Sequence, residues 1–473
     1  MILIRRTRFL NPLIGGALFL LLASNGFASA GQELSLVCHR VPPLAEVVDE
    51  ADARAEEAFC RINFSSPSVG ICPKTWSTSP GALVYDLTGT KWAGRAPDFE
   101  RETCADGRKA REEARAELAI FKNSLNGRET SGTFAPSSLL YYHFSRLLQT
   151  RLQVPVSVFA EFPVKPYLER VVVPGVRASE SARLKMLHAG WREMDLALSD
   201  PAAFNHRREL FTDDNTRLWG MLLVEEGRRY GPEVNGTRAS GWGDGQNHDF
   251  QRTPAFIALR TDAPLADAIA TGLTEAAADP EMGKALVRAP SAAQVAWWMN
   301  EITELVILDT LFRQQDRIGK IDYRWRWQWI EQGELRASYT DPGREDALKL
   351  RVSQLNDNDA GVRSGYANYA LRTGMLDGWH HLDPGLYRRV QTLGADFTTG
   401  GRVAQAVRAN YRLSQSEAEG VIKRGIQVAE ALRQRCESGA LRFDLSVANV
   451  LRPSAAVDAD APCALSPDQK PSG

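Results

Sequence analysis

The sequence predicts an α+β fold in which a mixed, sheet-containing part precedes a larger helical part. Two apolar runs with strand-like composition, Gly81 to Leu87 and Leu118 to Lys122, lie in the first third of the chain. Two long runs with helical spacing, Ser291 to Gln315 and Ser414 to Ser438, follow later. With 473 residues and 44% apolar side chains, the chain is long enough to bury one large core or the cores of two lobes.

The shorter elements follow from the same periodicities. Helical spacing occurs at Lys109 to Glu117 and at Ser137 to Thr150. The alternating aromatic stretch Tyr323 to Trp329 and the strand-like Lys349 to Leu355 predict a short β-hairpin after the first long helix. Gly227 to Thr253 is rich in Gly, Asn, Asp and Arg and has little periodicity, so we expect a long loop there.

Residues 1–30 have the features of an export signal. Three arginines precede an apolar run from Pro12 to Ala23, and small residues at 28–30 suit a signal peptidase. The run is shorter than the roughly 20 residues that span a bilayer, so we expect cleavage near Gly31 rather than a retained anchor. No later segment is long and apolar enough to span. The expected product is a soluble periplasmic or secreted protein with no stable membrane span after cleavage.

All six cysteines follow the predicted signal. An even number of cysteines in an exported chain predicts disulfide bonds, and no close Cys-x-x-Cys pair favours zinc or thioredoxin-type chemistry. Their pairing cannot be read from the sequence. The residues are Cys38, Cys60, Cys72, Cys104, Cys436 and Cys463.

The charge balance argues against one class of partner. The 57 basic residues include three arginines of the signal, so 54 remain against 58 acidic ones, a net charge of −4. A mature chain with this balance is not expected to bind nucleic acid broadly.

Three charged residues stand where apolar elements end. Lys122 ends a predicted strand, Asp316 follows the first long helix, and Asp357 follows the strand-like Lys349 to Leu355. Phosphoryl transfer needs a cation on the nucleotide phosphates, a carboxylate at the acceptor hydroxyl and another carboxylate on a metal ion. Singly, each residue is more simply an edge charge, a surface ion pair or a turn residue. Their order along the chain, however, is the order of the parts in a kinase.

The acidic run Leu355-Asn-Asp-Asn-Asp-Ala-Gly361 is the densest of these signals. Carboxylates at this density can bind a hard cation through oxygen ligands. Gly361 would allow a sharp turn that brings them together. The run is otherwise an ordinary turn, and it lacks the remaining ligands of a twelve-residue EF-hand loop.

Four short blocks between Leu118 and Tyr366 resemble the secretory-pathway kinase family, which includes Four-jointed and the Golgi casein kinase relatives. Ser138 to Pro155 resembles the helix that follows the lysine strand of that family, and Asp309 to Arg317 resembles its catalytic segment. The block from Asp357 to Tyr366, DNDAGVRSGY, is similar to the family's DNEAGLVHGY. This last match sets the register on Asp357.

The resemblance implies a two-lobed protein-kinase-like fold, with a small mixed N-lobe at 81–160 and a larger helical C-lobe at 161–452. Residues 31–80 would form a cysteine-bearing N-terminal extension, and residues 453–473 a loosely ordered tail. The family also implies ATP with a divalent metal, Mg or Mn, and phosphoryl transfer to a hydroxyl of a protein or glycan acceptor.

The same resemblance implies roles for individual residues. Lys122 would hold the nucleotide phosphates, and Asp316 would orient and deprotonate the acceptor hydroxyl. Asp357 would bind the metal, with Asp359 as a candidate ligand of a second ion. Arg317 would either position Asp316 or form a structural ion pair.

One departure from the family concerns the partner of the lysine. Ser138 stands where the family's helix has the glutamate that pairs with it, and serine cannot form that ion pair. Glu129, in the loop before this helix, is the candidate that could reach Lys122, although an acid in such a loop is more often solvated.

Two further departures concern the metal and the phosphates. Kinases place an Asn or an acid about five residues after the catalytic Asp, but here Ile321 occupies that position and Asp322 follows it. A clear Gly-rich phosphate loop is missing, and Thr88 to Gly94, with two glycines near two strands, is a weak candidate for it.

These departures leave other functions open. A catalytically inactive pseudokinase would use the same cleft as a binding or scaffold protein. A nucleotidyl transferase would have the same fold but bind the nucleotide in the opposite orientation, and it would transfer the nucleotidyl group. A disulfide-stapled envelope protein would have no nucleotide site.

Overall fold

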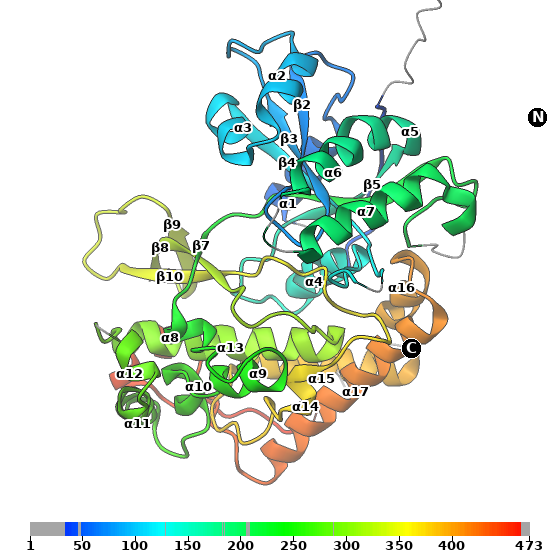
Figure 1. The fold of residues 1–473 in the computed structure, drawn as a ribbon. Helices are drawn as coiled ribbons and strands as arrows, with labels where there is room; N and C mark the ends of the chain where they lie inside the picture. Colours follow the sequence, from blue (N-terminus) through cyan, green and yellow to red (C-terminus); the bar gives the residue numbers. More distant parts are fainter. Residues whose placement is uncertain are drawn as a thin grey trace, which may run out of the picture. The chain divides into compact units, whose positions relative to one another are not determined.

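A computed structural model describes residues 34–45, 49–127, 129–181, 183, 185–204, 209–286 and 288–464. The predicted export signal at 1–30 lies outside these residues. The described elements belong to one unit, Glu33–Gly473, and they combine antiparallel sheets with many helices in an α+β fold (Figure 1).

The first sheet has six antiparallel strands in the order β1-β5-β6-β4-β3-β2. Side chains alternate between its faces, so that Ala82 and Phe121 pack on one face, and Leu83 and Ile120 on the other. Lys122 belongs by this alternation to the Ile120 face. The strands are β1 (Val37–His39), β2 (Val69–Pro73), β3 (Gly81–Asp86), β4 (Ala116–Asn123), β5 (Ser157–Pro163) and β6 (Arg217–Leu223).

Helices α1 to α7 accompany this sheet. α2 and α3 pack on the Ile120 face, whereas α5 to α7 cover the Phe121 face, as Figure 1 shows for α5, α6 and α7. A π-helical turn at Leu168–Val172 joins α5 to α6. The helices are α1 (Glu50–Cys60), α2 (Ala96–Thr103), α3 (Gly107–Glu113), α4 (Pro136–Leu147), α5 (Val164–Tyr167), α6 (Val173–Ser179) and α7 (Lys185–Ser199).

A second, four-stranded sheet is also antiparallel. Its order is β10-β8-β7, with β9 pairing β8. The strands are β7 (Arg228–Arg229), β8 (Asp322–Glu331), β9 (Glu334–Ser338) and β10 (Leu348–Gln354). The chain enters β8 and leaves β10 at the same end of the sheet, because Asp322 pairs with Gln354. The loops before β8 and after β10 therefore start side by side.

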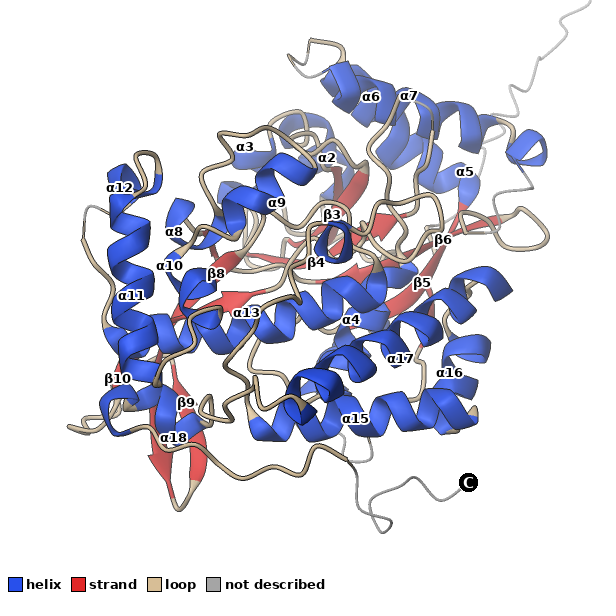
Figure 2. Ribbon diagram, turned by 90° about the horizontal axis from the view of Figure 1, so that it is seen from below, coloured by secondary structure: helices blue, strands red, loops and turns tan. Residues whose placement is uncertain are grey.

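The C-terminal half is mainly helical around α13 (Ala292–Phe312), whose side chains are buried almost throughout. Figure 2 shows α13, α15 and α17 next to one another, in agreement with their contacts. The other helices are α8 (Pro232–Asn235), α9 (Asp244–Phe250), α10 (Pro254–Leu259), α11 (Leu265–Ala278), α12 (Met282–Ala285), α14 (Tyr369–Arg372), α15 (Pro384–Thr399), α16 (Arg402–Asn410), α17 (Gln415–Glu437) and α18 (Val447–Leu451).

The six cysteines form three disulfide bonds, Cys38–Cys60, Cys72–Cys104 and Cys436–Cys463. The prediction of disulfides is confirmed, and such bonds are consistent with an oxidising location outside the cytoplasm. Among the helices of the described residues, none has the length and apolar character to cross a membrane.

Two expectations about secondary structure need correction. The long loop predicted at Gly227 to Thr253 is wrong, because this segment contains β7, α8 and α9. These helices span only four and seven residues, too few to show a helical period. The helix predicted at Lys109 to Glu117 ends at Glu113, since Ala114 is extended and β4 begins two residues later.

The predicted tail is described only as far as residue 464. A short 3₁₀ helix at Pro453–Ala455 begins it. The Val457 backbone exchanges two hydrogen bonds with the Asn449 side chain, and Cys463 is bonded to Cys436. This part is therefore tied to the helical body.

Candidate functional site

A pocket with a volume of 690 Å³ lies against the Ile120 face of the six-stranded sheet. The volume falls within the range of about 300–1,000 Å³ typical of small-molecule and cofactor sites. Four of the five predicted site residues, Lys122, Asp316, Asp357 and Asp359, line it. The lining comes from residues 74–83, 111–133, 224–229, 316–322 and 356–360.

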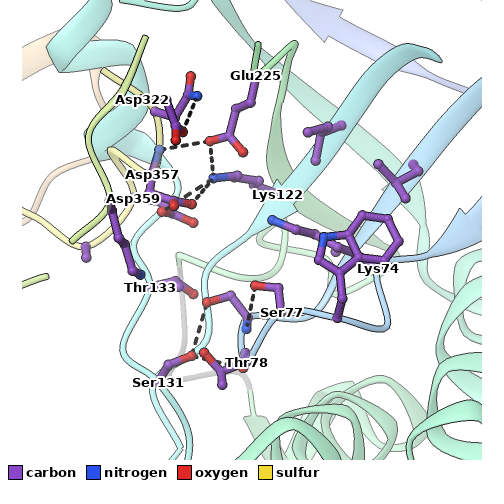
Figure 3. Close-up of a pocket in the computed structure, with 18 of the residues that line it drawn as sticks. Lys74, Ser77, Thr78, Lys122, Ser131, Thr133, Glu225, Asp322, Asp357 and Asp359 are labelled. Carbon is purple, nitrogen blue, oxygen red and sulfur yellow. Dashed lines mark hydrogen bonds and ion pairs between the residues drawn. The ribbon is translucent and has the colours of Figure 1, made fainter. Parts of the chain in front are cut away.

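The Lys122 ammonium lies at the centre of a carboxylate cluster (Figure 3). Its Nζ is 2.6 Å from Glu225 Oε1, 3.2 Å from Asp357 Oδ1 and 3.7 Å from Asp359 Oδ1. The same Glu225 oxygen accepts a hydrogen bond of 2.9 Å from the backbone N–H of Asp357. The first two contacts are hydrogen bonds and the third is an ion pair, so two of the three donors of the ammonium are bonded to carboxylates.

The cluster fixes the charge of its members. Burial alone would lower the pKa of Lys122, but the carboxylates of Asp359, Glu225 and Asp357 outweigh it and hold that pKa well above its usual range. Burial would likewise raise the pKa of Asp357, but nearby lysines, Lys122 first, bring it well below its usual range. Both groups are therefore charged at neutral pH.

The turn that carries the two aspartates is held from both sides. Asp357 has φ of 51°, in the left-handed region that Asp tolerates better than most residues. Gln314 Nε2 donates to the Asp357 carbonyl at 3.3 Å, and the Phe134 backbone N–H donates to the Asp359 carbonyl at 2.6 Å. Residues before α4 and after α13 thus place the turn against Lys122.

Asp316 lies in the loop between α13 and β8. Its Oδ2 is 2.7 Å from Lys320 Nζ, and its backbone N–H donates to Gln314 Oε1 at 3.2 Å. Burial would lower the pKa of Lys320, but Asp357 and Asp316 raise it above its usual value. The Asp316 carboxylate therefore faces the pocket beside a charged ammonium.

Arg317 is a structural tie between the two loops. Its Nε lies 3.1 Å from Asp309 Oδ2 on α13, inside the core. Its Nη1 donates to the Asn356 carbonyl and its Nη2 to Asn358 Oδ1, both at 2.7 Å. The structural ion pair, one of two alternatives for this residue, is present and ties Arg317 to α13. The two hydrogen bonds to Asn356 and Asn358 fix the Asp316 loop to the Asp357 turn.

Asp322, rather than Ile321, faces the pocket. Ile321 is buried in the core, whereas Asp322 accepts hydrogen bonds from Arg229 Nε at 2.7 Å and from Asn356 Nδ2 at 2.8 Å. Burial raises the pKa of Asp322 above its usual value. The Asn356 Oδ1 atom is buried without a hydrogen-bond partner, although Asn356 also lines the pocket.

These oxygens suit a divalent ion that keeps other ligands. No group of three or more His, Cys, Asp or Glu side chains is arranged to hold a metal among the described residues. Mg²⁺ bound with phosphates, however, uses only one or two carboxylates and takes water and phosphate oxygens besides. Asp357, Asp359 and the unpaired Asn356 Oδ1 form a donor set of this kind.

Two sequence candidates lie elsewhere. Glu129 lines a different pocket of 610 Å³ together with residues of α7, and the acid that pairs with Lys122 is Glu225. Thr88 to Gly94 follows the far end of β3, and none of its residues lines the Lys122 pocket. The loop at the other end of β3, residues 74–80, lines it instead.

Glu225 carries the same kind of sequence signal as Lys122. Glu225 and Glu226 directly follow the apolar run Leu218 to Val224, and a charge ending an apolar strand is also what selected Lys122. No model of a known protein family matches this chain, and no curated protein matches it.

Proposed function

We propose that this chain is an exported, kinase-like phosphotransferase that moves the terminal phosphoryl group of ATP, with Mg or Mn, to a hydroxyl of a protein or glycan. The observation that carries the proposal is the meeting of Lys122, Asp316 and Asp357 in one pocket. Lys122 and Asp357 are 235 positions apart in the sequence, yet their side chains are 3.2 Å apart.

The order of the elements supports the same fold. An antiparallel sheet carries the lysine on β4, and α4 follows it directly. The buried helix α13 precedes the Asp316 loop, and β8 to β10 precede the Asp357 turn. Protein kinases use this succession of lysine strand, helix, catalytic loop and metal-binding turn. We therefore include a two-lobed protein-kinase-like fold in the proposal.

Each residue has a defined task in this proposal. Asp316 accepts the proton of the acceptor hydroxyl at its carboxylate, and Lys320, whose ammonium lies 2.7 Å away, holds that carboxylate in place. Lys122 provides positive charge for the nucleotide phosphates. Asp357 and Asp359, with Asn356 Oδ1, would hold the divalent ion. That ion, when bound, neutralises charge on the phosphates.

A pseudokinase is the second candidate, and one observation favours it. Lys122 donates hydrogen bonds to two carboxylates and lies 3.7 Å from a third, so a phosphate must compete with them. The helix α4 contains no Asp or Glu that could replace Glu225, and the hydroxyl of Ser138 is buried there without a hydrogen-bond partner. A protein locked in this arrangement would serve as a scaffold.

Label transfer from ATP tests the proposal. The mature chain is incubated with γ-labelled ATP and Mg²⁺ or Mn²⁺, together with exported proteins and glycans as acceptors. Asp316→Asn should reduce transfer about a hundredfold or more while nucleotide binding persists. Asp341→Asn, an exposed loop acid, is the matched control and should transfer normally.

The melting temperature separates the two candidates. Stabilisation by ATP and metal that is lost in Asp357→Ala indicates a nucleotide site. Stabilisation without any transfer would identify the pseudokinase. Absence of both stabilisation and transfer would reject the kinase proposal.

A further inference from the structure

Two lysines flank a glycine across three neighbouring strands. Gly81 pairs with Lys122 in the β3–β4 ladder. On the other side of Gly81, the pairing of Pro73 with Ala82 places Lys74 opposite it, and the Lys74 backbone N–H donates to the Gly81 carbonyl at 2.9 Å. Lys74, Gly81 and Lys122 therefore form one row across β2, β3 and β4.

The row faces the pocket. Residues directly opposite in an antiparallel sheet point to the same face, and Leu83 and Ile120, two positions along their strands, line the pocket with both lysines. Strands lie about 4.8 Å apart, so the two lysine backbones are separated by roughly 10 Å. Gly81 contributes no side chain to the gap between them.

Gly81 is required by its surroundings as well. A Cβ atom at this position would lie 2.7 Å from the carbonyl oxygen of Phe121, a distance that real Cβ contacts do not reach. A larger residue would push β3 away from β4 and would also fill the gap. The glycine thus keeps a slot open between two cations.

Lys74 is the unpaired cation of this slot. Its side chain is buried, with 8% of the residue exposed, and its ammonium makes no ion pair or hydrogen bond within the described residues. Figure 3 shows the side chain extending toward the Lys122 cluster. It is close enough to act through space on two carboxylates of the pocket: it contributes to the lowered pKa of Asp357 and opposes the rise that burial causes in the pKa of Glu117. Lys122, in contrast, is occupied by carboxylates.

The loop after Lys74 is fixed rather than open. Ser79 Oγ lies 3.1 Å from Ser131 Oγ, and Ser131 Oγ donates to the Thr78 carbonyl at 2.9 Å. The Ser79 backbone N–H donates to Ser77 Oγ at 3.3 Å. These bonds hold one wall of the slot in place before any ligand arrives, which lowers the entropy lost on binding.

We infer that the Lys74–Gly81–Lys122 row binds the di- or triphosphate chain of a nucleotide, with Lys74 as its main cation in the resting protein. The inference rests on the proposed function and specifies its phosphate site. A buried ammonium that makes no direct hydrogen bond or ion pair can donate charge-assisted hydrogen bonds to phosphate oxygens. The Ser/Thr-rich loop 75–80 connects two strands beside the proposed phosphate site. In kinases a Gly-rich loop occupies the corresponding position.

Titration with three probes tests this site. The probes are Mg²⁺ with inorganic tripolyphosphate, Mg²⁺ with ATP, and adenosine alone. Lys74→Met should weaken binding of both phosphate probes about tenfold, the loss of one charge-assisted contact. Binding of adenosine should not change. Lys74→Gln is a second variant and should behave in the same way.

A matched control removes one charge from the same half of the fold. Lys91 is exposed and paired with Glu113, and Lys91→Met should bind all probes as the wild type does. Because the Lys74 ammonium makes no hydrogen bond or ion pair with the described residues, both Lys74 variants should fold with a melting temperature close to that of the wild type without ligand.

The outcomes separate this inference from the proposed function. Lys74-dependent binding of tripolyphosphate without any label transfer supports the phosphate site and counts against the kinase. Label transfer with unchanged phosphate affinity in Lys74→Met overturns the phosphate site and leaves the kinase standing. Lys74 variants that no longer fold would show a structural ammonium, and they too would overturn it.

Discussion

Two buried cation–carboxylate clusters lie close together, and they differ in what surrounds them. In the first, the Arg317 guanidinium binds the Asp309 carboxylate, which also accepts a hydrogen bond of 2.6 Å from Tyr141. The remaining Arg317 donors end on Asn356 and Asn358. Every partner is inside the core.

The second cluster, around Lys122, has the same chemistry but faces a pocket. Its carboxylates retain exposed fractions of 15% for Glu225 and 25% for Asp357, against 5% for Asp309. A sealed cluster can only hold the fold together. A cluster that faces a pocket also has carboxylate oxygens that a ligand can reach. This difference in exposure is why we assign a structural role to the Arg317 cluster and a binding role to the Lys122 cluster.

The largest expected effect comes from breaking the sealed cluster. Arg317→Met would leave Asp309 buried without its cation, and we expect a loss of about 3–5 kcal/mol in the free energy of unfolding. Urea denaturation measures it. Arg336→Met, which removes an exposed arginine paired with Glu334, should cost less than about 1 kcal/mol. Equal losses of unfolding free energy in Arg317→Met and Arg336→Met would contradict a structural role for the buried cluster.

The open cluster should respond to a metal ion. Lys122→Met leaves three carboxylates short of a cation, and we expect a smaller loss of about 2 kcal/mol because water in the pocket solvates them. Millimolar Mg²⁺ should restore much of this stability, since the ion replaces the ammonium. The same addition should not help Arg317→Met. Urea denaturation with and without Mg²⁺ measures the gain in stability of each variant. An equal gain in Lys122→Met and Arg317→Met would contradict the proposed difference between the two clusters.

Glu301 provides a third case for the comparison, because its carboxyl group is buried in the core and has no cation paired with it in the part of the chain that the structure describes. Burial raises the pKa of Glu301, on α13, to about 8. The folded state therefore binds this proton more tightly than the unfolded state, so the stabilisation is complete below about pH 4.5 and is lost as pH rises toward 8.

Glu301→Gln should remove this pH dependence. Gln can accept from the Ser353 backbone N–H and donate to Ser353 Oγ, the groups that Glu301 contacts now. We expect the wild type to lose about 3 kcal/mol relative to the variant between pH 5 and pH 8. Unfolding free energies at four pH values measure the slope. Parallel curves would mean that Glu301 is ionised in the fold.

The smallest effect concerns Glu225, which competes with phosphate for Lys122. Glu225→Gln should tighten binding of Mg²⁺-ATP about threefold, because a partly exposed ion pair no longer has to break. Calorimetric titration measures the dissociation constant. Glu226→Gln changes the neighbouring residue, whose carboxylate pairs with Arg324, and should have no effect. Weaker binding in Glu225→Gln would instead make Glu225 a positioning residue for Lys122.

Much of the fold could be predicted because long periodic segments carry their own signal. The strands at Gly81–Asp86 and Leu348–Gln354 and the helices at Ala292–Phe312 and Gln415–Glu437 agree with the expected ranges to within a few residues. The short helices within 227–253 contain too few residues to show a helical periodicity in the sequence. The disulfide pairing depends on distances between cysteines in the folded chain, which their spacing in the sequence does not determine.

Part of the site could also be predicted, because some of its residues have a recognisable place in the sequence. Lys122, Asp316 and Asp357 each end an apolar element, which a sequence can show. Lys74 was not found, because its place beside Lys122 depends on the register of three strands. Glu225 was missed because its partner is reached only after β6 pairs with β4.

The most direct test of the central claim is to locate the metal and the nucleotide together. A crystal of the mature chain with Mn²⁺ and a non-hydrolysable ATP analogue gives the ion's position by anomalous scattering. The account predicts a Mn²⁺ peak coordinated by the Asp357 carboxylate, with the phosphate chain between Lys74 and Lys122. Nucleotide bound outside this pocket, or Mn²⁺ away from Asp357, would contradict it.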